Sequence, residues 1–219
     1  MPDGLLDGQW TAVAWVLFAI AAIAAVRSAP WRVLQESTRL NAFLALVVTL
    51  TLLWNLKAGV KPGLALHLLG ATVFTLSFGP HLAFIGLSLV TLGITLNGAA
   101  GGFAYALNAL LLAGVGVVLS QRLYRLFSLW LPKHFFVYIF VNGFFGAALT
   151  TIGVGVVSTC FLAMAGAYEW EYLSGEYLPY FLLLAFSEAW LSGMVMTLFV
   201  VYRPNWVLTF DDSRYLTGK

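Results

Sequence analysis

Long apolar runs, separated by short charged or glycine-rich segments, dominate the hydropathy pattern of the chain. A transmembrane helix needs roughly 20 mostly apolar residues, so each run is a candidate membrane span. The runs are continuously apolar and lack the alternation of an outer-membrane β-barrel. The pattern therefore predicts an all-α integral membrane protein, with a single membrane domain over residues 1–219. The seven expected spans are residues 10–26, 41–56, 63–78, 82–97, 99–120, 135–167 and 178–202.

The sixth run is longer than one membrane crossing requires. At 1.5 Å rise per residue it would extend about 50 Å, against a hydrocarbon core of about 30 Å. We therefore expect it to tilt, or to break near Gly143, Gly146, Gly153 or Gly155.

The charges of the loops predict the orientation of the chain. Nine basic residues belong to one side: Arg27, Arg32, Arg39, Arg122, Arg125, Lys133, Arg203, Arg214 and Lys219. The other side has only two basic residues together with five acidic ones: Lys57, Lys61, Asp3, Asp7, Glu169, Glu171 and Glu176. Because basic loops stay in the cytoplasm, we expect the N-terminus outside and the C-terminus in the cytoplasm. No basic stretch precedes the first run, so we expect no cleavable signal peptide.

Composition excludes several classes of protein. Of the 219 residues, 61% are hydrophobic and 9% are charged, whereas a soluble domain has about 25% charged residues. The net charge is only +2 and no basic stripe is present, which excludes nucleic-acid binding. The single cysteine, Cys160, excludes an internal disulfide and a multi-thiolate metal site.

Tyrosines and tryptophans at the predicted span ends, among them Trp54 and Tyr177, are expected to anchor the chain at the membrane interface.

Polar residues inside the predicted spans are the first functional candidates, because they are costly in lipid. Glu188 is the only formally charged residue inside a span. It fits either a proton or cation relay, or an interhelical hydrogen-bond partner of Asn108 or Asn142, the notable buried amides.

His67 is the only histidine clearly inside a predicted span, about one turn from its external end. Imidazole is the commonest metal ligand and suits nickel, cobalt, copper and zinc. The alternative is a histidine that packs between helices and bonds to a carbonyl. His81 and His134 are expected at the opposite, cytoplasmic face.

Signatures of the common hydrolases do not occur in the sequence. There is no Gly-x-Ser-x-Gly elbow, no His-Glu-x-x-His and no phosphate-binding Gly-Lys-Ser/Thr loop. We therefore expect the chain not to be an enzyme. If it takes part in ATP-driven transport, another subunit supplies the ATPase.

Several segments resemble the CbiM-type substrate-capture subunit of energy-coupling-factor cobalt and nickel importers, and they follow one another in the same order as in that family. They are Met1-Pro2-Asp3-Gly4-Leu5-Leu6, His67-Leu68-Leu69-Gly70-Ala71-Thr72, Phe78-Gly79-Pro80, Ala106-Leu107-Asn108-Ala109, Leu131-Pro132-Lys133-His134-Phe135-Phe136, Val141-Asn142-Gly143-Phe144-Phe145-Gly146 and Ser187-Glu188-Ala189. The resemblance covers nearly the whole chain, and residues 202–216 are similar to a proteobacterial subgroup. It implies a multi-pass protein of the bacterial inner membrane, with a membrane coupling subunit and cytoplasmic ATPases as partners. No prosthetic group is implied, and the expected substrate is a divalent cobalt or nickel ion.

The resemblance also implies a metal site. In the family, the external N-terminus folds back into the bundle, and a near-planar nitrogen set combines the terminal amine, a histidine at position two and a second histidine. His67 matches the second histidine, but this chain has Pro2, which offers no backbone N–H. Either the natural start lies upstream and restores the first histidine, or Met1, Asp3 and His67 form a mixed nitrogen and oxygen set. Polar support for this metal site inside the membrane would then come from Asn108, Asn142 and Glu188.

Two functions follow from these observations. The first is the substrate-binding subunit of an ATP-driven importer of a transition metal, which captures the ion near the outer face. The alternative is a non-transporting accessory or scaffold subunit of a larger membrane complex.

Overall fold

The computed structural model describes residues 1–56, 58–59, 61 and 64–215, and this part of the chain is mainly helical. Its elements are α1 (Gly8–Ser28), η1 (Trp31–Gln35), α2 (Ser37–Asn55), β1 (Ala58–Gly59), β2 (Ala65–Leu66), α3 (Ala71–Leu96), α4 (Tyr105–Ala109), η2 (Leu110–Val115), α5 (Gly116–Trp130), α6 (Phe135–Val137), η3 (Tyr138–Phe145), α7 (Gly146–Met164), α8 (Trp170–Glu176), α9 (Tyr180–Tyr202), η4 (Pro204–Trp206) and α10 (Asp212–Tyr215). The predictions made for Lys57, Gly63, Leu216 and Lys219 lie outside the described residues.

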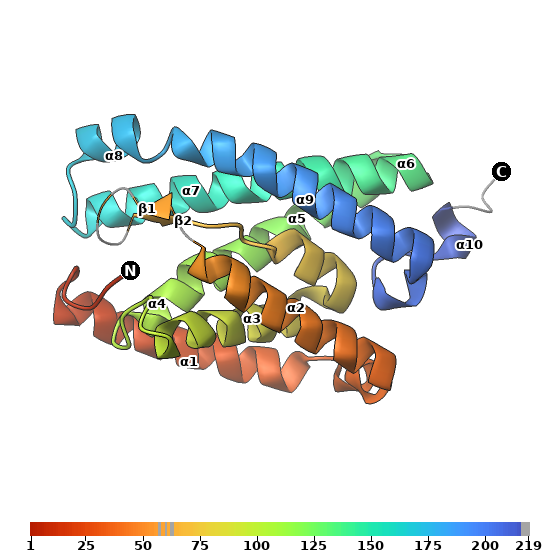
Figure 1. Ribbon diagram of the computed structural model, residues 1–219, viewed down its shortest axis with the longest axis horizontal. Coiled ribbons are helices and arrows are strands. Elements are labelled where there is room, and N and C mark those ends of the chain that lie inside the picture. The colour runs from red at the N-terminus through yellow and green to blue at the C-terminus, as the bar shows by residue number, and fades with distance from the viewer. Residues whose placement is uncertain (57, 60, 62–63, 216–219) are drawn as a thin grey trace.

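The long helices lie side by side along one axis (Figure 1). By length and composition alone, six helices of the described chain qualify as membrane spans: α1, α2, α3 (which is broken at Gly79), residues 105–130, residues 135–164 and α9. The expected all-α membrane fold is therefore confirmed. The sixth predicted run does not break at its glycines, because α6, η3 and α7 form one continuous helix of 30 residues. Its η3 portion is π-helical, a locally wider winding.

The third and fourth predicted spans form a single element, α3, which doubles back on itself. Gly79 has non-helical angles, φ 78° and ψ 167°, and Pro80 follows it. Gly70 and Gly93 both lie against neighbouring residues of α2, since a Cβ on each would meet Leu50 and Thr51 respectively. A straight helix would separate residues 70 and 93 by about 35 Å. We therefore describe α3 as two arms, residues 71–78 and 80–96, and the expectation of a full-length third span was wrong.

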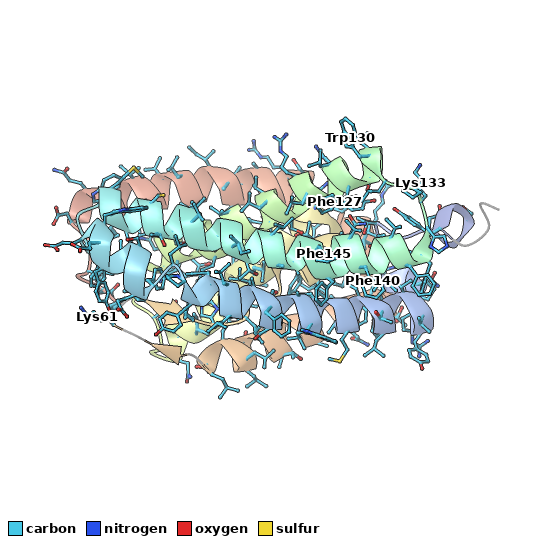
Figure 2. The ribbon with its side chains drawn as sticks, turned by 90° about the horizontal axis from the view of Figure 1, so that it is seen from above. Lys61, Phe127, Trp130, Lys133, Phe140 and Phe145 are labelled. Atoms are coloured by element: carbon cyan, nitrogen blue, oxygen red, sulfur yellow. The ribbon has the colours of Figure 1, made fainter. Side chains whose placement is uncertain are left out.

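The two ends of the bundle differ in charge. Figure 1 shows the N-terminus, the β1–β2 pair and α8 at one end, and α6 and α10 at the other. We call the first the acidic end; among the described residues its loops and adjoining chain carry Asp3, Asp7, Glu169, Glu171 and Glu176, with Lys61. We call the second the basic end; Arg27, Arg32, Arg39, Arg125, Lys133 and Arg203 lie in or beside its loops. Figure 2 shows Lys61 and Lys133 at these opposite ends.

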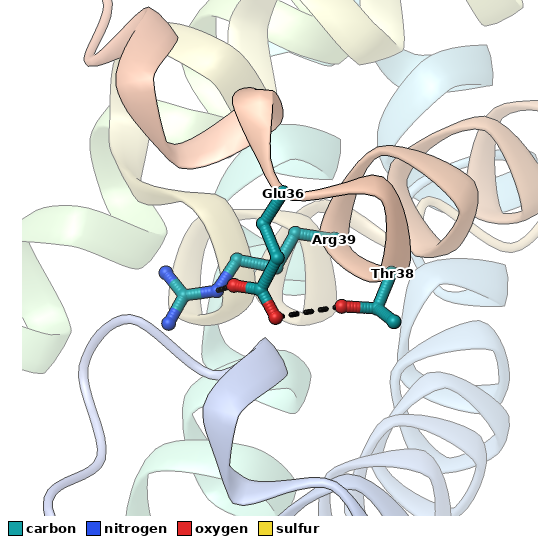
Figure 3. A network of polar contacts seen from close by, with 3 residues as sticks. All are labelled: Glu36, Thr38 and Arg39. Atoms are coloured by element: carbon teal, nitrogen blue, oxygen red, sulfur yellow. Dashed lines mark hydrogen bonds and ion pairs between the residues drawn. The ribbon is translucent and has the colours of Figure 1, made fainter.

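Helix α3 lies at the centre of the bundle. Of the residues in its most apolar 18-residue segment, 78% are buried, against 11% in the corresponding segment of α1. Its aromatic side chains pack against α2, with Phe43 in edge-to-face contact with Phe74 and Phe78. At the beginning of α2, on the surface, Glu36 pairs with Arg39 and accepts a hydrogen bond from Thr38 (Figure 3). An exposed pair of this kind contributes about 1 kcal/mol or less. Apolar packing around α3 therefore contributes more to the stability of the bundle than this ion pair does.

Candidate functional site

His67 lies in the extended segment between β2 and α3, at the acidic end. The expectation that it lies one turn inside a helix was wrong, because α3 begins only at Ala71, after Gly70 in the left-handed conformation. The imidazole is 9% exposed and stacks on the indole of Trp54, with 4.2 Å between ring centroids. Trp54 is itself 1% exposed, so it is not the interfacial anchor that its position at a span end predicted. The stack fixes the plane of the imidazole ring.

The N-terminal residue folds back into the bundle beside this segment. The Met1 amine donates to Asn108 Oδ1 at 2.6 Å, and Asn108 Nδ2 donates to the Met1 carbonyl at 3.1 Å. The Gly101 N–H donates to the same carbonyl at 3.0 Å, and a Cβ at Gly101 would collide with Asp3. A side chain at position 101 would therefore push the N-terminus away. The glycine-rich turn at residues 98–102 therefore contacts the N-terminal segment directly.

Asp3 holds the N-terminal segment against that turn. Its two carboxylate oxygens accept hydrogen bonds from Gly102 N–H at 3.0 Å and Ala104 N–H at 2.9 Å. Ala104 directly precedes α4, so the carboxylate lies at a helix N-terminus, where negative charge is favoured. Asp3 is exposed and is not among the residues that line the cavity beside His67. The structure thus groups Asp3 with the loop rather than with the imidazole.

A cavity of about 50 Å³ brings the remaining candidates together. Its lining includes Met1, His67 and Asn108, from the N-terminus, the segment before α3 and helix α4. The other lining residues are Trp54, Ala65, Ile94, Ala99, Ala100, Leu111, Leu112, Ser158 and Tyr177. The space is small, and its polar groups come from segments far apart in the sequence.

Two polar residues of this lining, Ser158 and Tyr177, were not predicted as site residues. Ser158 is buried in α7. Nothing in the surrounding sequence distinguishes this serine from the other small residues of a membrane helix. Tyr177 was expected at the interface, but it is 4% exposed. Burial raises the pKa of Tyr177 to about 12, so its hydroxyl is neutral at physiological pH. Both side chains can orient a ligand without adding charge.

Glu188 lies on α9 and binds the backbone just before α3. Its carboxylate accepts hydrogen bonds from Leu69 N–H at 2.8 Å and Gly70 N–H at 2.7 Å, and from Ser192 Oγ at 3.4 Å. In the described part of the chain this carboxylate bonds to these backbone and hydroxyl groups, and not to the asparagine that was expected as its partner. Its role here is to hold the segment that carries His67.

Asn142 is separate from this group. It is 6% exposed within the π-helical η3, beside Gly143, whose Cβ would meet Met196 of α9. It does not line the cavity that contains His67.

The donor set limits what the cavity can bind. No group of three or more His, Cys, Asp or Glu side chains that could hold a metal occurs in the described part of the chain. A metal here would need the Met1 amine and the His67 imidazole, both nitrogen donors of the kind that nickel, cobalt and copper accept. Asn108 can orient the amine, because it contacts the nitrogen and the carbonyl of the same residue.

Comparison with known proteins yields one family and a shared fold. The family model of the cobalt uptake substrate-specific transmembrane region matches residues 1–206. A solved structure described as a truncated transition metal transporter is similar with a TM-score of 0.72 at 20% identity, over 92% of this chain and 98% of the other. A second, described as a transition metal transporter, has a TM-score of 0.69 at 20% identity, over 90% of each chain. No curated protein matches the chain.

Proposed function

The chain belongs to the family of cobalt uptake substrate-specific transmembrane regions, and from this membership we propose that it is the subunit that captures a divalent cobalt or nickel ion for import. The observation that carries the proposal is the cavity that Met1 and His67 share. Two nitrogen donors that are 66 residues apart in the sequence thus line one small space.

The local geometry supports nitrogen coordination. Deprotonation frees a lone pair on the Met1 amine, and the remaining N–H groups can still donate to Asn108 Oδ1. The stack on Trp54 holds the second donor, His67, in one orientation. Pro2 has no amide N–H to deprotonate, so the protein set comprises these two nitrogens, and the neutral oxygens of the cavity can complete it. We propose that Asp3 positions the N-terminal segment and does not bind the metal, because its carboxylate accepts hydrogen bonds from Gly102 and Ala104.

The direction of capture follows from the charge asymmetry. We infer that the basic end lies in the cytoplasm, and this orientation supports capture near the outer face of a bacterial inner membrane. The chain has no phosphate-binding loop, and we propose, from the family resemblance, that partner ATPases and a membrane coupling subunit supply the energy for release inward. The acidic loops beside the cavity would raise the local concentration of cations.

Calorimetric titration of the purified full chain with Ni²⁺, Co²⁺, Cu²⁺ and Zn²⁺ tests this function. Any purification tag belongs after Lys219, and the intact mass must show Met1 as the first residue. We expect His67→Ala to weaken Ni²⁺ and Co²⁺ binding by at least about 100-fold, since it removes a ligand. The matched control is His81→Ala, because His81 lies in α3 beside the break, away from the cavity.

A second variant tests the other donor. Two residues added before Met1 convert the amine into an amide and should abolish binding as His67→Ala does. Equal binding by the wild type and His67→Ala would contradict the proposed site. No binding of any of the four ions by the wild type would contradict capture and favour the scaffold alternative.

A further inference from the structure

The first arm of α3, residues 71–78, is a short helix between two glycines that have positive φ. Gly70 has φ 67° and Gly79 has φ 78°. Eight residues of α-helix extend about 12 Å, so the arm is a short rod whose direction depends on how its two ends are held. Its first end continues directly into the segment of His67.

Glu188 holds the first end. Its carboxylate binds the N–H groups of both Leu69 and Gly70, and all three residues are buried. Hydrogen bonds to a carboxylate are stronger than those between neutral groups. The backbone two and three residues after His67 is therefore fixed to α9.

The C-terminal tail, residues 207–215, holds the other end. The Gly79–Pro80 break deprives the last turn of the arm of its usual donors, because proline has no N–H. The tail supplies donors instead: Leu208 N–H bonds to the Ser77 carbonyl at 3.0 Å, and Thr209 N–H bonds to the Leu76 carbonyl at 3.2 Å. Thr209 Oγ1 also donates to the Leu76 carbonyl, at 2.8 Å.

The tail is itself fastened to the neighbouring helices. Thr209 Oγ1 lies 2.6 Å from the hydroxyl of Tyr138, and the hydroxyl of Tyr124 donates to the Thr209 carbonyl at 3.2 Å. Phe210 is 7% exposed and packs edge-to-face on Tyr138. The match to the family model ends at residue 206. The contacts of Leu208, Thr209 and Phe210 therefore lie in a part of the chain beyond the match.

We propose that Glu188 and Thr209 are positioning residues that clamp the two ends of the arm, so that the tail at the basic end sets the placement of His67 at the acidic end. The arm can tilt about Gly70 and Gly79 when either clamp opens. A tilt displaces the His67 segment relative to Met1 and Asn108. The metal part of this inference rests on the proposed function, whereas the clamp itself does not.

Hydrogen exchange of the metal-free full chain, read by mass spectrometry, tests the clamp directly. Thr209→Val removes the hydroxyl contacts with Leu76 and Tyr138 and keeps the side-chain shape. We expect the amides of residues 66–79 to exchange about fivefold faster and the Ni²⁺ affinity to fall about threefold to tenfold. Thr209→Ser should restore both values. The matched control is Thr197→Val, which removes a hydroxyl that bonds only within α9, to the Gly193 carbonyl.

A second variant ends the chain after Trp206 and removes the whole tail. It should accelerate exchange at residues 66–79 more strongly than Thr209→Val, while the other helices keep their wild-type rates. Unchanged exchange at residues 66–79 in Thr209→Val, or equal acceleration in all helices, would overturn the clamp. If the wild type binds no metal, the proposed function fails, and the exchange rates still decide for or against the clamp.

Discussion

The side chain of Asn108 bonds directly to the N-terminal amine. Its amide contacts both the nitrogen and the carbonyl of Met1, and it is 3% exposed. Such a pair of hydrogen bonds orients a terminal residue that would otherwise move freely in water. Asn108 is therefore the side chain whose loss should affect binding most without removing a proposed ligand.

We expect Asn108→Ala to weaken Ni²⁺ or Co²⁺ binding by about 10-fold to 100-fold, the usual effect of removing a residue that orients a ligand. The measurement is calorimetric titration of the protein with a native N-terminus. Asn142→Ala is the control, because Asn142 is a buried amide outside the cavity and its loss should leave the affinity unchanged. Equal affinities of Asn108→Ala and the wild type would contradict this role of Asn108.

Tyr177 should make stability depend on alkaline pH. Its pKa is about 12 in the folded protein, because of burial, and about 10 in the unfolded chain. Below pH 10 the hydroxyl is protonated in both states; between pH 10 and 12 only the unfolded state loses the proton. The free energy of unfolding should therefore fall by about 2–3 kcal/mol over that interval.

Denaturant unfolding in detergent at pH 9 to 12 measures this dependence. Tyr177→Phe should show a smaller decrease than the wild type, because it has no hydroxyl to ionise. Tyr202→Phe, which removes an exposed tyrosine, serves as the control and should keep the wild-type decrease. An identical decrease in Tyr177→Phe and the wild type would exclude this contribution.

Among the helices, α3 differs most from what hydropathy predicts. A run of apolar residues indicates burial in lipid or protein, but it does not show where the backbone reverses. The sequence Gly79-Pro80 was assigned to a loop between two full spans, and in the structure it is the tight break between a short arm and a long one. The positive φ of Gly79 is therefore needed for the chain reversal within α3.

Gly79→Ala should lower the free energy of unfolding by about 1–2 kcal/mol, because φ 78° is unfavourable for an L side chain. The added Cβ would also lie 3.2 Å from Leu208 Cδ2, so the tail would have to shift. Denaturant unfolding in detergent checks this value. At Gly175 in α8 a Cβ meets no heavy atom within 4 Å, so Gly175→Ala should leave stability unchanged or slightly raise it.

Charge at the two ends of the bundle determines the orientation we assign to the entire chain. We expect the acidic end outside and the basic end in the cytoplasm. Single cysteines at Gly175 and Lys133, in a Cys160→Ser background, report the two ends, because both positions are exposed. A membrane-impermeant maleimide should label Gly175→Cys in intact cells, and Lys133→Cys only after the membrane is opened. The reverse pattern would contradict the orientation.

The sequence predicts the fold class and most span positions well, because membrane burial produces long apolar runs regardless of partners. It predicts His67 and Asn108 as candidates for the same reason: polar groups are rare in such runs. It could not predict that Trp54 stacks on His67, or that Glu188 binds the N–H groups of Leu69 and Gly70. Those contacts join segments more than ten residues apart, and their geometry depends on how the helices pack.

The volume of the cavity between Met1 and His67, about 50 Å³, has a consequence for uptake kinetics. A water needs about 10–15 Å³ of this kind of volume, so the space holds roughly three to five waters, fewer than the six of a hexahydrated ion. Such an ion must therefore lose part of its hydration shell as it enters. The loss of water should contribute to the barrier to entry, and an ion that arrives inside a bulky organic chelate should be rejected by size.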